Sequence, residues 1–195
     1  MLRTLGSTEP ERLEATYETL TRQCKATAGL PACRTAYPPI DDYRAEWLNV
    51  DADVPQLLEA LRRRPRGRLL FHGPPGTGKT GLAHHPAQAL DRPLRVRRAS
   101  DLVSKWVGET EKNLCAMFVE AAAADAVLLL DDADRFLQDR SRARAQWEVT
   151  EVNELLTQME GFGGLFICAT NFIEQLDPAA MRRFSPKLAF GPLQA

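Results

Sequence analysis

The chain has 195 residues, of which 44% are hydrophobic and 26% charged, and its formal net charge is −1. This length suits one domain with an appendage, and the composition is that of a soluble globular protein rather than a collagen-like or low-complexity one. The near-neutral charge disfavours a protein that binds nucleic acid through an overall basic surface. There is no signal peptide, no CxxC pair and no apolar stretch approaching the roughly 20 residues of a membrane-spanning helix, so we expect a cytoplasmic protein.

Residues 1–45 are predicted to form an N-terminal helix followed by a proline-rich linker. Thr8 and Glu11 have the spacing of a helix capping box, and apolar residues then recur at helical intervals. A second helix is predicted to begin after Asp53 as its N-cap and to carry one apolar face. The basic run RRRPRGR, residues 62–68, is expected to end that helix.

Residues 46–195 are predicted to form a single α/β core, because short apolar runs alternate with helical stretches from Gly67 onward. Such alternation is typical of a parallel sheet with helices on both faces. Runs as apolar as AVLLL fit strands that are buried on both sides. The prediction is a three-layer αβα sandwich around a five-stranded parallel sheet, with strands at 68–72, 93–98, 126–130, 165–169 and 187–190 and helices at 79–90, 114–124, 148–159 and 178–182.

The segment GPPGTGKT has the pattern G-x-x-x-x-G-K-[ST] of a phosphate-binding loop and lies between a predicted strand and a predicted helix. In such a loop the glycines let the backbone turn inward, so that its N–H groups and the helix N-terminus surround an anion. Lys79 is expected to reach the β- and γ-phosphates of a nucleotide, and the Thr80 hydroxyl to hold Mg²⁺. The alternative is a glycine- and proline-rich turn without a ligand. The residues predicted to bind the nucleotide are Gly73, Pro74, Pro75, Gly76, Thr77, Gly78, Lys79 and Thr80.

Two further predicted strands end in polar residues that suit the same chemistry. The run AVLLLDDAD leads into Asp131, whose carboxylate is expected to complete a Mg²⁺ shell with Thr80. Asp132 beside it can orient or deprotonate an attacking water. The run GLFICATN ends in Asn171, which can hydrogen-bond the water or the γ-phosphate if the two strands are neighbours. Taken alone, each pattern is equally typical of a strand followed by a polar turn.

Six segments in one order resemble the AAA+ ATPases, and among these the Cdc48-like and proteasomal ATPases of the AAA subgroup, in a bacterial form. They are GPPGTGKT, SKWVGETEKNL, LLLDDADRFL, WEVTEVNELLTQMEGF, ICATN and LDPAAMRRF, and the resemblance covers residues 65–192. It implies a P-loop NTPase fold that binds ATP with Mg²⁺ and hydrolyses it. It also implies assembly into hexameric rings and the remodelling or threading of a protein substrate.

The resemblance implies roles for single residues as well. The phosphate loop corresponds to the Walker A motif and Asp131 to the Walker B magnesium ligand, and Asp132 stands at the position of the catalytic glutamate. Asn171 corresponds to the sensor-1 residue. Arg182 and Arg183 lie where such proteins carry arginine fingers, which reach the nucleotide of a neighbouring subunit.

The segment SKWVGETEKN matches the aromatic–hydrophobic–glycine pore loop with which relatives grip an unfolded polypeptide. Trp106 and Val107 are then the gripping residues, and a large, rigid aromatic ring suits chains of varied sequence. Outside this motif, a lone tryptophan would more simply be a core residue. Relatives place a second pore loop after the Walker B motif, and Arg140, Arg142 and Arg144 lie there in this chain.

Three features depart from the family pattern. Asp132 replaces the usual glutamate, and its shorter side chain predicts nucleotide binding that is kept and hydrolysis that is weakened. Pro86 lies inside the predicted helix that follows the phosphate loop, and it predicts a kink and a lower stability there. The chain stops at Ala195, so the helical lid that AAA+ modules normally add is absent, and either the chain is a fragment or the protein is truncated.

The leading hypothesis is an ATP-dependent protein-remodelling enzyme. The alternative is a truncated nucleotide-binding module with weak or no hydrolysis, which uses ATP as a regulatory or structural ligand. A third hypothesis, a nucleic-acid-directed ATPase, rests only on the arginine clusters at 62–68 and 92–98. We expect those clusters instead to solvate helix ends and subunit faces. No membrane partner and no metal other than Mg²⁺ are expected.

Overall fold

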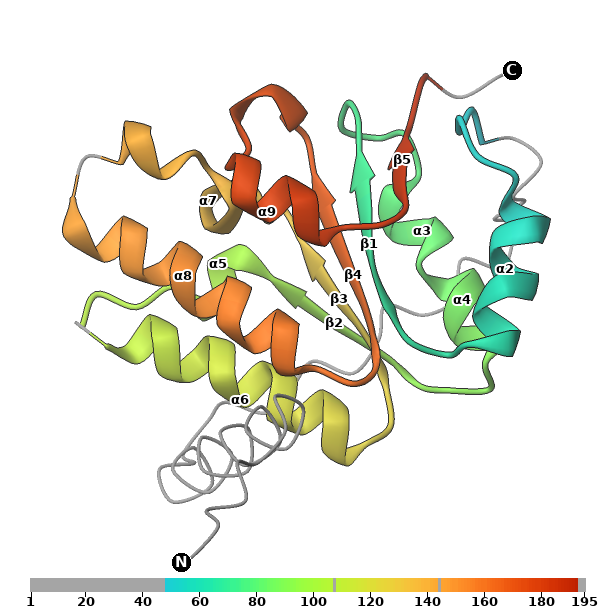
Figure 1. Cartoon of the computed structure of the whole chain (residues 1–195), viewed down its shortest axis with the longest axis horizontal. Coiled ribbons are helices and arrows are strands. Elements are labelled where there is room, and N and C mark those ends of the chain that lie inside the picture. Colours follow the sequence, from blue (N-terminus) through green and yellow to red (C-terminus); the bar gives the residue numbers. More distant parts are fainter. Residues whose placement is uncertain (1–47, 107, 144, 193–195) are drawn as a thin grey trace, which may run out of the picture.

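The computed structural model describes residues 48–192 except residues 107 and 144 (Figure 1). The predicted N-terminal helix and linker, residues 1–45, lie outside the described residues. Five strands form one all-parallel sheet in the order β2-β3-β4-β1-β5, which confirms the predicted α/β class. The strands are β1 (Gly67–His72), β2 (Leu94–Arg98), β3 (Val127–Asp131), β4 (Leu165–Thr170) and β5 (Lys187–Ala189).

Helices cover both faces of this sheet, as the predicted three-layer sandwich requires (Figure 1). On one face lie α2 (Val54–Arg63), α3 (Lys79–Leu82) and α4 (His84–Ala89). The helices of the other face are α5 (Ala99–Leu102), α6 (Glu109–Ala123), α7 (Asp134–Leu137), α8 (Gln146–Gly161) and α9 (Pro178–Arg183), accompanied by the short 3₁₀ helices η2 (Arg140–Arg142) and η3 (Ile173–Gln175).

The strands β1, β3 and β4 supply alternate side chains to two separate apolar cores, because successive residues of a strand point to opposite faces. The apolar residues of β2 and β5 join only the core beside α2 to α4. Along β4, Phe166 packs against α6 and α8, whereas Leu165 and Ile167 face the layer of α2 to α4. All six residues of β4 are buried, as the uninterrupted apolar run predicts for a central strand.

The sheet order decides where the polar strand ends meet. β4 lies directly between β1 and β3, and all three strands run in parallel. Their carboxyl ends therefore share one edge of the sheet, and the segments that follow them are side by side. These segments are the phosphate loop after β1, the acidic run after β3 and Asn171 after β4.

The helix predicted at 79–90 is interrupted, which confirms the kink expected from Pro86, whereas the lower stability stays a prediction. α3 ends at Leu82, and α4 begins at His84. Proline has no N–H to donate to the carbonyl four residues earlier, here that of Leu82, so a continuous helix would leave this carbonyl without its bond. Ala83 and Ala87 nonetheless stay buried against the sheet. The first turn, which follows the phosphate loop directly, precedes the break and keeps its helical form.

The helix predicted at 114–124 begins earlier, at Glu109. Gly108 before it has a φ of +80°, a left-handed conformation that glycine adopts without strain. Glu109 and Glu111 then lie in the first turn, where carboxylates interact favourably with the helix dipole. Among the residues that the structure describes, no helix has both the length and the apolar character needed to cross a bilayer.

Candidate nucleotide-binding site

The loop after β1 adopts backbone conformations that depend on its glycines. Gly76 and Gly78 have φ values of +78° and +87°, in the left-handed region that other residues rarely adopt. Gly73 has a φ of +145°, and a Cβ atom there would collide with the Phe190 carbonyl oxygen just after β5. A side chain at Gly73 would therefore push the phosphate loop away from the sheet.

Lys79 is buried at the base of the loop, where its ammonium group donates three hydrogen bonds. The acceptors are the carbonyl oxygens of Gly73 at 2.6 Å and Pro74 at 2.7 Å, and Oδ1 of Asn171 at 2.8 Å. Burial lowers the pKa of Lys79 below its ordinary value, whereas the nearby carboxylates, Asp131 first, act in the opposite direction. The cation is thus fixed between the loop and the end of β4, where phosphate oxygens would need it.

Thr80 and Asp131, the two predicted magnesium ligands, are in contact. The Thr80 hydroxyl, in the first turn of α3, donates a hydrogen bond of 2.7 Å to Oδ2 of Asp131 at the end of β3. A hydroxyl and a carboxylate beside a phosphate loop fit Mg²⁺, which binds one or two protein oxygens together with phosphate oxygens and water. These are the residues that would hold the ion.

Asp132 and Asn171 face each other across the ends of β3 and β4. Asp132 is exposed to solvent, and its φ of +52° is unusual for a residue other than glycine. Its N–H donates to Oδ1 of Asp131 at 3.0 Å, and its own Oδ1 accepts a hydrogen bond of 3.4 Å from the Asn171 side-chain amide. Since Asn171 also contacts Lys79, the predicted phosphate, metal and water-activating groups form one connected set.

Asp134 belongs to the same network, although the sequence did not single it out. Its Oδ1 accepts hydrogen bonds from the Thr170 hydroxyl at 2.5 Å and from the backbone N–H groups of Asn171 at 3.0 Å and Phe172 at 3.2 Å. One carboxylate oxygen therefore fixes the turn that carries Asn171. The only signal in the sequence was a third acid in the run DDAD.

The two candidate arginine fingers on α9 differ in their surroundings. Arg183 forms an ion pair with Glu160 at the C-terminal end of α8 and donates a hydrogen bond of 2.9 Å to the Ala179 carbonyl. Arg182 is exposed, and within the part of the chain that the structure describes its side chain has no hydrogen bond or ion pair. Only Arg182 is thus available to a neighbouring molecule without breaking an existing contact.

Trp106 lies in the loop before α6, and 73% of its surface is exposed. The loop is closed by hydrogen bonds at its base: Ser104 N–H donates to the Thr110 hydroxyl at 3.1 Å, and the Ser104 hydroxyl is bonded to the Glu109 carboxylate. The indole is therefore held out from a fixed base. Val107, the other predicted gripping residue, lies outside the described residues.

The basic segment after the Walker B motif is only partly described. Arg140 pairs with Asp177 at 2.8 Å and donates to Asn153 at 2.7 Å, so its guanidinium joins η2 to α8 and α9 instead of projecting from a loop. The side chains of Arg142 and Arg144 lie outside the description. Nothing in the geometry of Arg140 favours a role in a second pore loop.

Comparison with known proteins agrees with this geometry. Residues 69–192 match the model of the ATPase family associated with various cellular activities (AAA). The chain belongs to the AAA family of ATPases. Family membership supports the binding and hydrolysis of ATP by this domain, and it agrees with the P-loop fold.

Individual AAA ATPases match over about two thirds to three quarters of the chain. Fidgetin-like protein 1 of Drosophila melanogaster is 38% identical over 141 residues, which are 69% of this chain and 27% of that protein. Protein CdcH of Halobacterium salinarum is 33% identical over 153 residues, 75% of this chain and 21% of that protein. The ATPase histone chaperone abo1 of Schizosaccharomyces pombe is 34% identical over 148 residues, 70% of this chain and 12% of that protein. The chain thus matches between about an eighth and a quarter of the length of these relatives.

Proposed function

We propose that this chain is the ATP-hydrolysing motor domain of a machine that remodels or threads proteins. The observation that carries the proposal is the exposed Trp106 side chain on a hydrogen-bonded loop. An exposed tryptophan has a cost in water, and soluble proteins retain large exposed aromatic groups mainly where they contact a partner. The name of one relative, a histone chaperone, also points to a protein substrate.

Each part of ATP hydrolysis can be assigned to residues of this site. The loop amides and Lys79 would hold the β- and γ-phosphates, and Asp132 and Asn171 would place a water in line with the γ-phosphorus. The water oxygen attacks phosphorus as its proton passes to Asp132, the bond to the β-phosphate oxygen breaks, and ADP and inorganic phosphate leave. Mg²⁺ bound at Thr80 and Asp131 would neutralise charge on the phosphate oxygens.

We propose that hydrolysis is slow in the isolated chain. Asp132 has one methylene fewer than glutamate, so its carboxylate lies closer to the backbone and further from a water at the γ-phosphate. This also favours the second candidate function, a module that binds ATP as a regulatory or structural ligand. Measuring both ATP turnover and ATP affinity distinguishes the two functions. Tight binding with little turnover would favour the regulatory or structural module, and steady turnover would favour the motor.

We also propose that the site is completed by Arg182 of a neighbouring copy in a hexameric ring. The exposure of Arg182 and the lack of a described side-chain partner support this role, whereas Arg183 is held by Glu160. Replacing Arg182 with alanine should abolish turnover in the assembled protein while nucleotide binding persists. The Arg183→Ala variant should keep turnover, and size-exclusion mass with ATP reports whether the ring forms.

The test of the motor proposal is Trp106→Ala compared with Trp106→Phe. We expect both variants to hydrolyse ATP at the parent rate, because Trp106 does not contact the phosphate loop. Only Trp106→Ala should lose ATP-dependent unfolding of a fluorescent protein that carries an unstructured tail, since phenylalanine keeps an aromatic ring. Unfolding by Trp106→Ala at the parent rate would refute the proposal.

The proposed setting of the protein is the cytoplasm, and residues 46–195 are proposed to form its core. The proposed partner is a protein rather than nucleic acid or a membrane.

A further inference from the structure

A basic groove lies at the edge of the sheet opposite the phosphate loop. Two adjoining hollows, each of about 500 Å³, share Arg64, Arg66 and the backbone around Gly163 as walls. This edge holds the start of β1 and the turn before β4, because the N–H of Gly67 donates to the carbonyl of Gly164. The groove is therefore separate from the nucleotide site, which lies at the carboxyl ends of the same strands.

The charge of the groove is strongly positive. Six arginines line the two hollows, against the two carboxylates of Asp125 and Glu160. Four of these arginines already have partners. Arg92 bonds Asp125 and the Pro65 carbonyl, and Arg63 pairs with Glu59. The other two, Arg68 and Arg183, bond groups at the end of α8.

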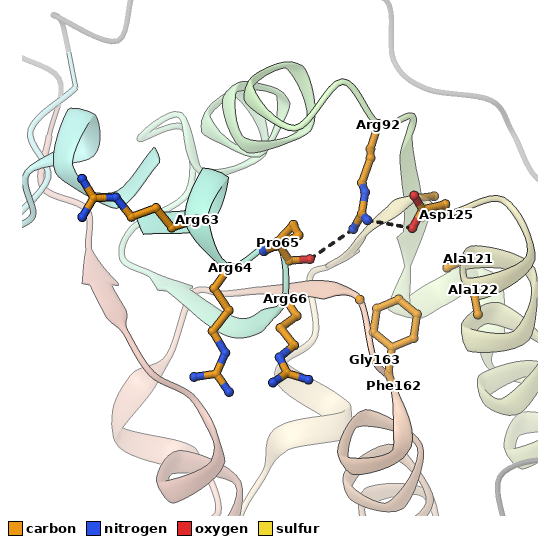
Figure 2. A pocket seen from close by; sticks show the side chains of 12 residues that line it. Arg63, Arg64, Pro65, Arg66, Arg92, Ala121, Ala122, Asp125, Phe162 and Gly163 are labelled. Carbon is orange, nitrogen blue, oxygen red and sulfur yellow. Dashed lines mark hydrogen bonds and ion pairs between the residues drawn. The ribbon is translucent and has the colours of Figure 1, made fainter. Parts of the chain in front are cut away.

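Arg64 and Arg66 differ from the other four. Both are exposed, and within the residues that the structure describes neither side chain has a hydrogen bond or an ion pair. Their guanidinium groups extend in the same direction from one turn, away from the Arg92–Asp125 pair and from Arg63 (Figure 2). Two like charges side by side repel each other, so an anion that contacts both relieves an unfavourable interaction.

The turn that carries these two arginines is held rigidly. The Arg64 N–H donates to the Ala60 carbonyl at 3.0 Å, and the Arg66 N–H donates to the Arg64 carbonyl at 2.8 Å. Arg92 then fixes the Pro65 carbonyl between them at 3.1 Å (Figure 2). Because the backbone is already ordered, binding would cost little additional backbone entropy.

We propose that this groove binds an extended acidic segment of a partner protein, with Arg64 and Arg66 each taking one carboxylate. Alternate residues of an extended chain point to the same side, so two acids separated by one residue can reach both guanidinium groups. Arginine binds carboxylates through paired, charge-assisted hydrogen bonds. The net charge of −1 makes nucleic acid the less suitable occupant, since proteins that bind a long polyanion usually carry a large basic excess.

Gly163 offers a way to block the groove without disturbing the core. It is exposed, and a Cβ added there would meet no atom within 4 Å. Glutamate at this position would place a carboxylate in the groove wall and compete with the partner. Gly164 beside it is unsuitable, because its added Cβ would strike the ring of Phe162.

The experiment measures the fluorescence anisotropy of a labelled peptide of alternating glutamate and serine, with the full-length chain. We expect the parent to bind the peptide in a salt-sensitive way. Binding should weaken by roughly tenfold or more in Arg64→Gln/Arg66→Gln, which loses the charge-assisted hydrogen bonds, and in Gly163→Glu, whose carboxylate occupies the same arginines. Gly163→Ala and Arg62→Gln/Lys187→Gln, the latter removing two exposed cations outside both hollows, should bind as the parent does. Basal ATP turnover should be unchanged in all four variants.

Two results would overturn the proposal. One is equal peptide binding by the parent and Arg64→Gln/Arg66→Gln, which would mean that the groove does not recognise acids. The other is tighter binding of a single-stranded oligothymidylate than of the peptide through the same two arginines, which would make nucleic acid the occupant. Because neither readout requires ATP, failure here is distinguishable from failure of the motor proposal.

Discussion

At the scale of single residues, the expected rate of hydrolysis depends on the methylene group that Asp132 lacks relative to glutamate. Asp132 lies opposite Asn171, with 3.4 Å between the hydrogen-bonded atoms, so its carboxylate is already oriented towards the site. Asp132→Glu should extend the carboxylate towards the water and raise kcat, by up to about a hundredfold if the present misplacement is near 1 Å. Phosphate release at saturating ATP measures it. Asp132→Asn, which cannot accept the proton, serves as the inactive control, and an unchanged rate in Asp132→Glu would contradict the prediction.

Asp134 gives a second prediction at this scale. Replacing it with asparagine removes the charge that accepts three hydrogen bonds around Asn171. We expect kcat to fall by roughly tenfold, because charge-assisted bonds to a positioning group weaken and Asn171 shifts, while KM for ATP changes little. Asp53→Asn is the matched control, since Asp53 caps α2 and does not contact the site. Equal losses in both variants, or a rise in KM alone, would mean that Asp134 only stabilises the fold.

At the scale of an element, Pro86 divides the helix that leaves the phosphate loop. Pro86→Leu restores the N–H that can bond the Leu82 carbonyl, so we expect α3 and α4 to join and the melting temperature to rise by about 2–4 °C for each kcal/mol recovered. Thermal denaturation followed by circular dichroism measures both effects. Pro55→Leu is the control, because Pro55 occupies the first turn of α2, where proline is favourable. No rise in Pro86→Leu would refute the prediction.

The elements themselves were predictable to different degrees. Each strand was predicted to within a residue at either end. For β3 and β4 the signal was an uninterrupted apolar run, which marks a strand that is buried on both faces. The helix α6 was predicted to start five residues late, since its first turn is polar and follows Gly108. The short helices α5 and α7 were missed, because four residues show no helical periodicity.

The residues proposed for the phosphate loop and the magnesium site were chosen from local sequence, because GPPGTGKT and the acidic end of β3 each carry their chemistry in a few consecutive residues. A place for Asn171 beside the γ-phosphate was predicted only on condition that the strands are neighbours, and its contacts with Lys79 and Asp132 were not predicted. The strand order that places β4 between β1 and β3 depends on packing across the whole sheet. The role of Asp134 could not be predicted for the same reason.

At the scale of the whole molecule, partly buried histidines link stability to pH. Burial lowers the pKa values of His72, His84 and His85 below the ordinary 6.5. Between the lowered values and 6.5 the unfolded chain binds more protons than the folded one, so stability rises with pH through this window and is fully present above it. Urea denaturation should give a free energy of unfolding that decreases as the pH falls below about 6.5.

The control for the pH prediction is His84→Gln, which removes one titrating group. Its free energy of unfolding should depend less steeply on pH below 6.5 than that of the parent, and the two curves should be parallel above that value. A parent curve that is flat between about pH 5 and pH 7 would contradict the prediction.

The position of β4 in the middle of the sheet has a consequence for synthesis of the chain. Lys79 and Asn171 are 92 residues apart in sequence, yet they are bonded at 2.8 Å because they follow the neighbouring strands β1 and β4. A nascent chain that has released β1 to β3 from the ribosome has its phosphate loop and both acidic residues, but β1 and β3 still lack the strand that separates them. Nucleotide capture would thus become possible only after β4 has emerged, and bound ATP would then stabilise the folded domain by mass action.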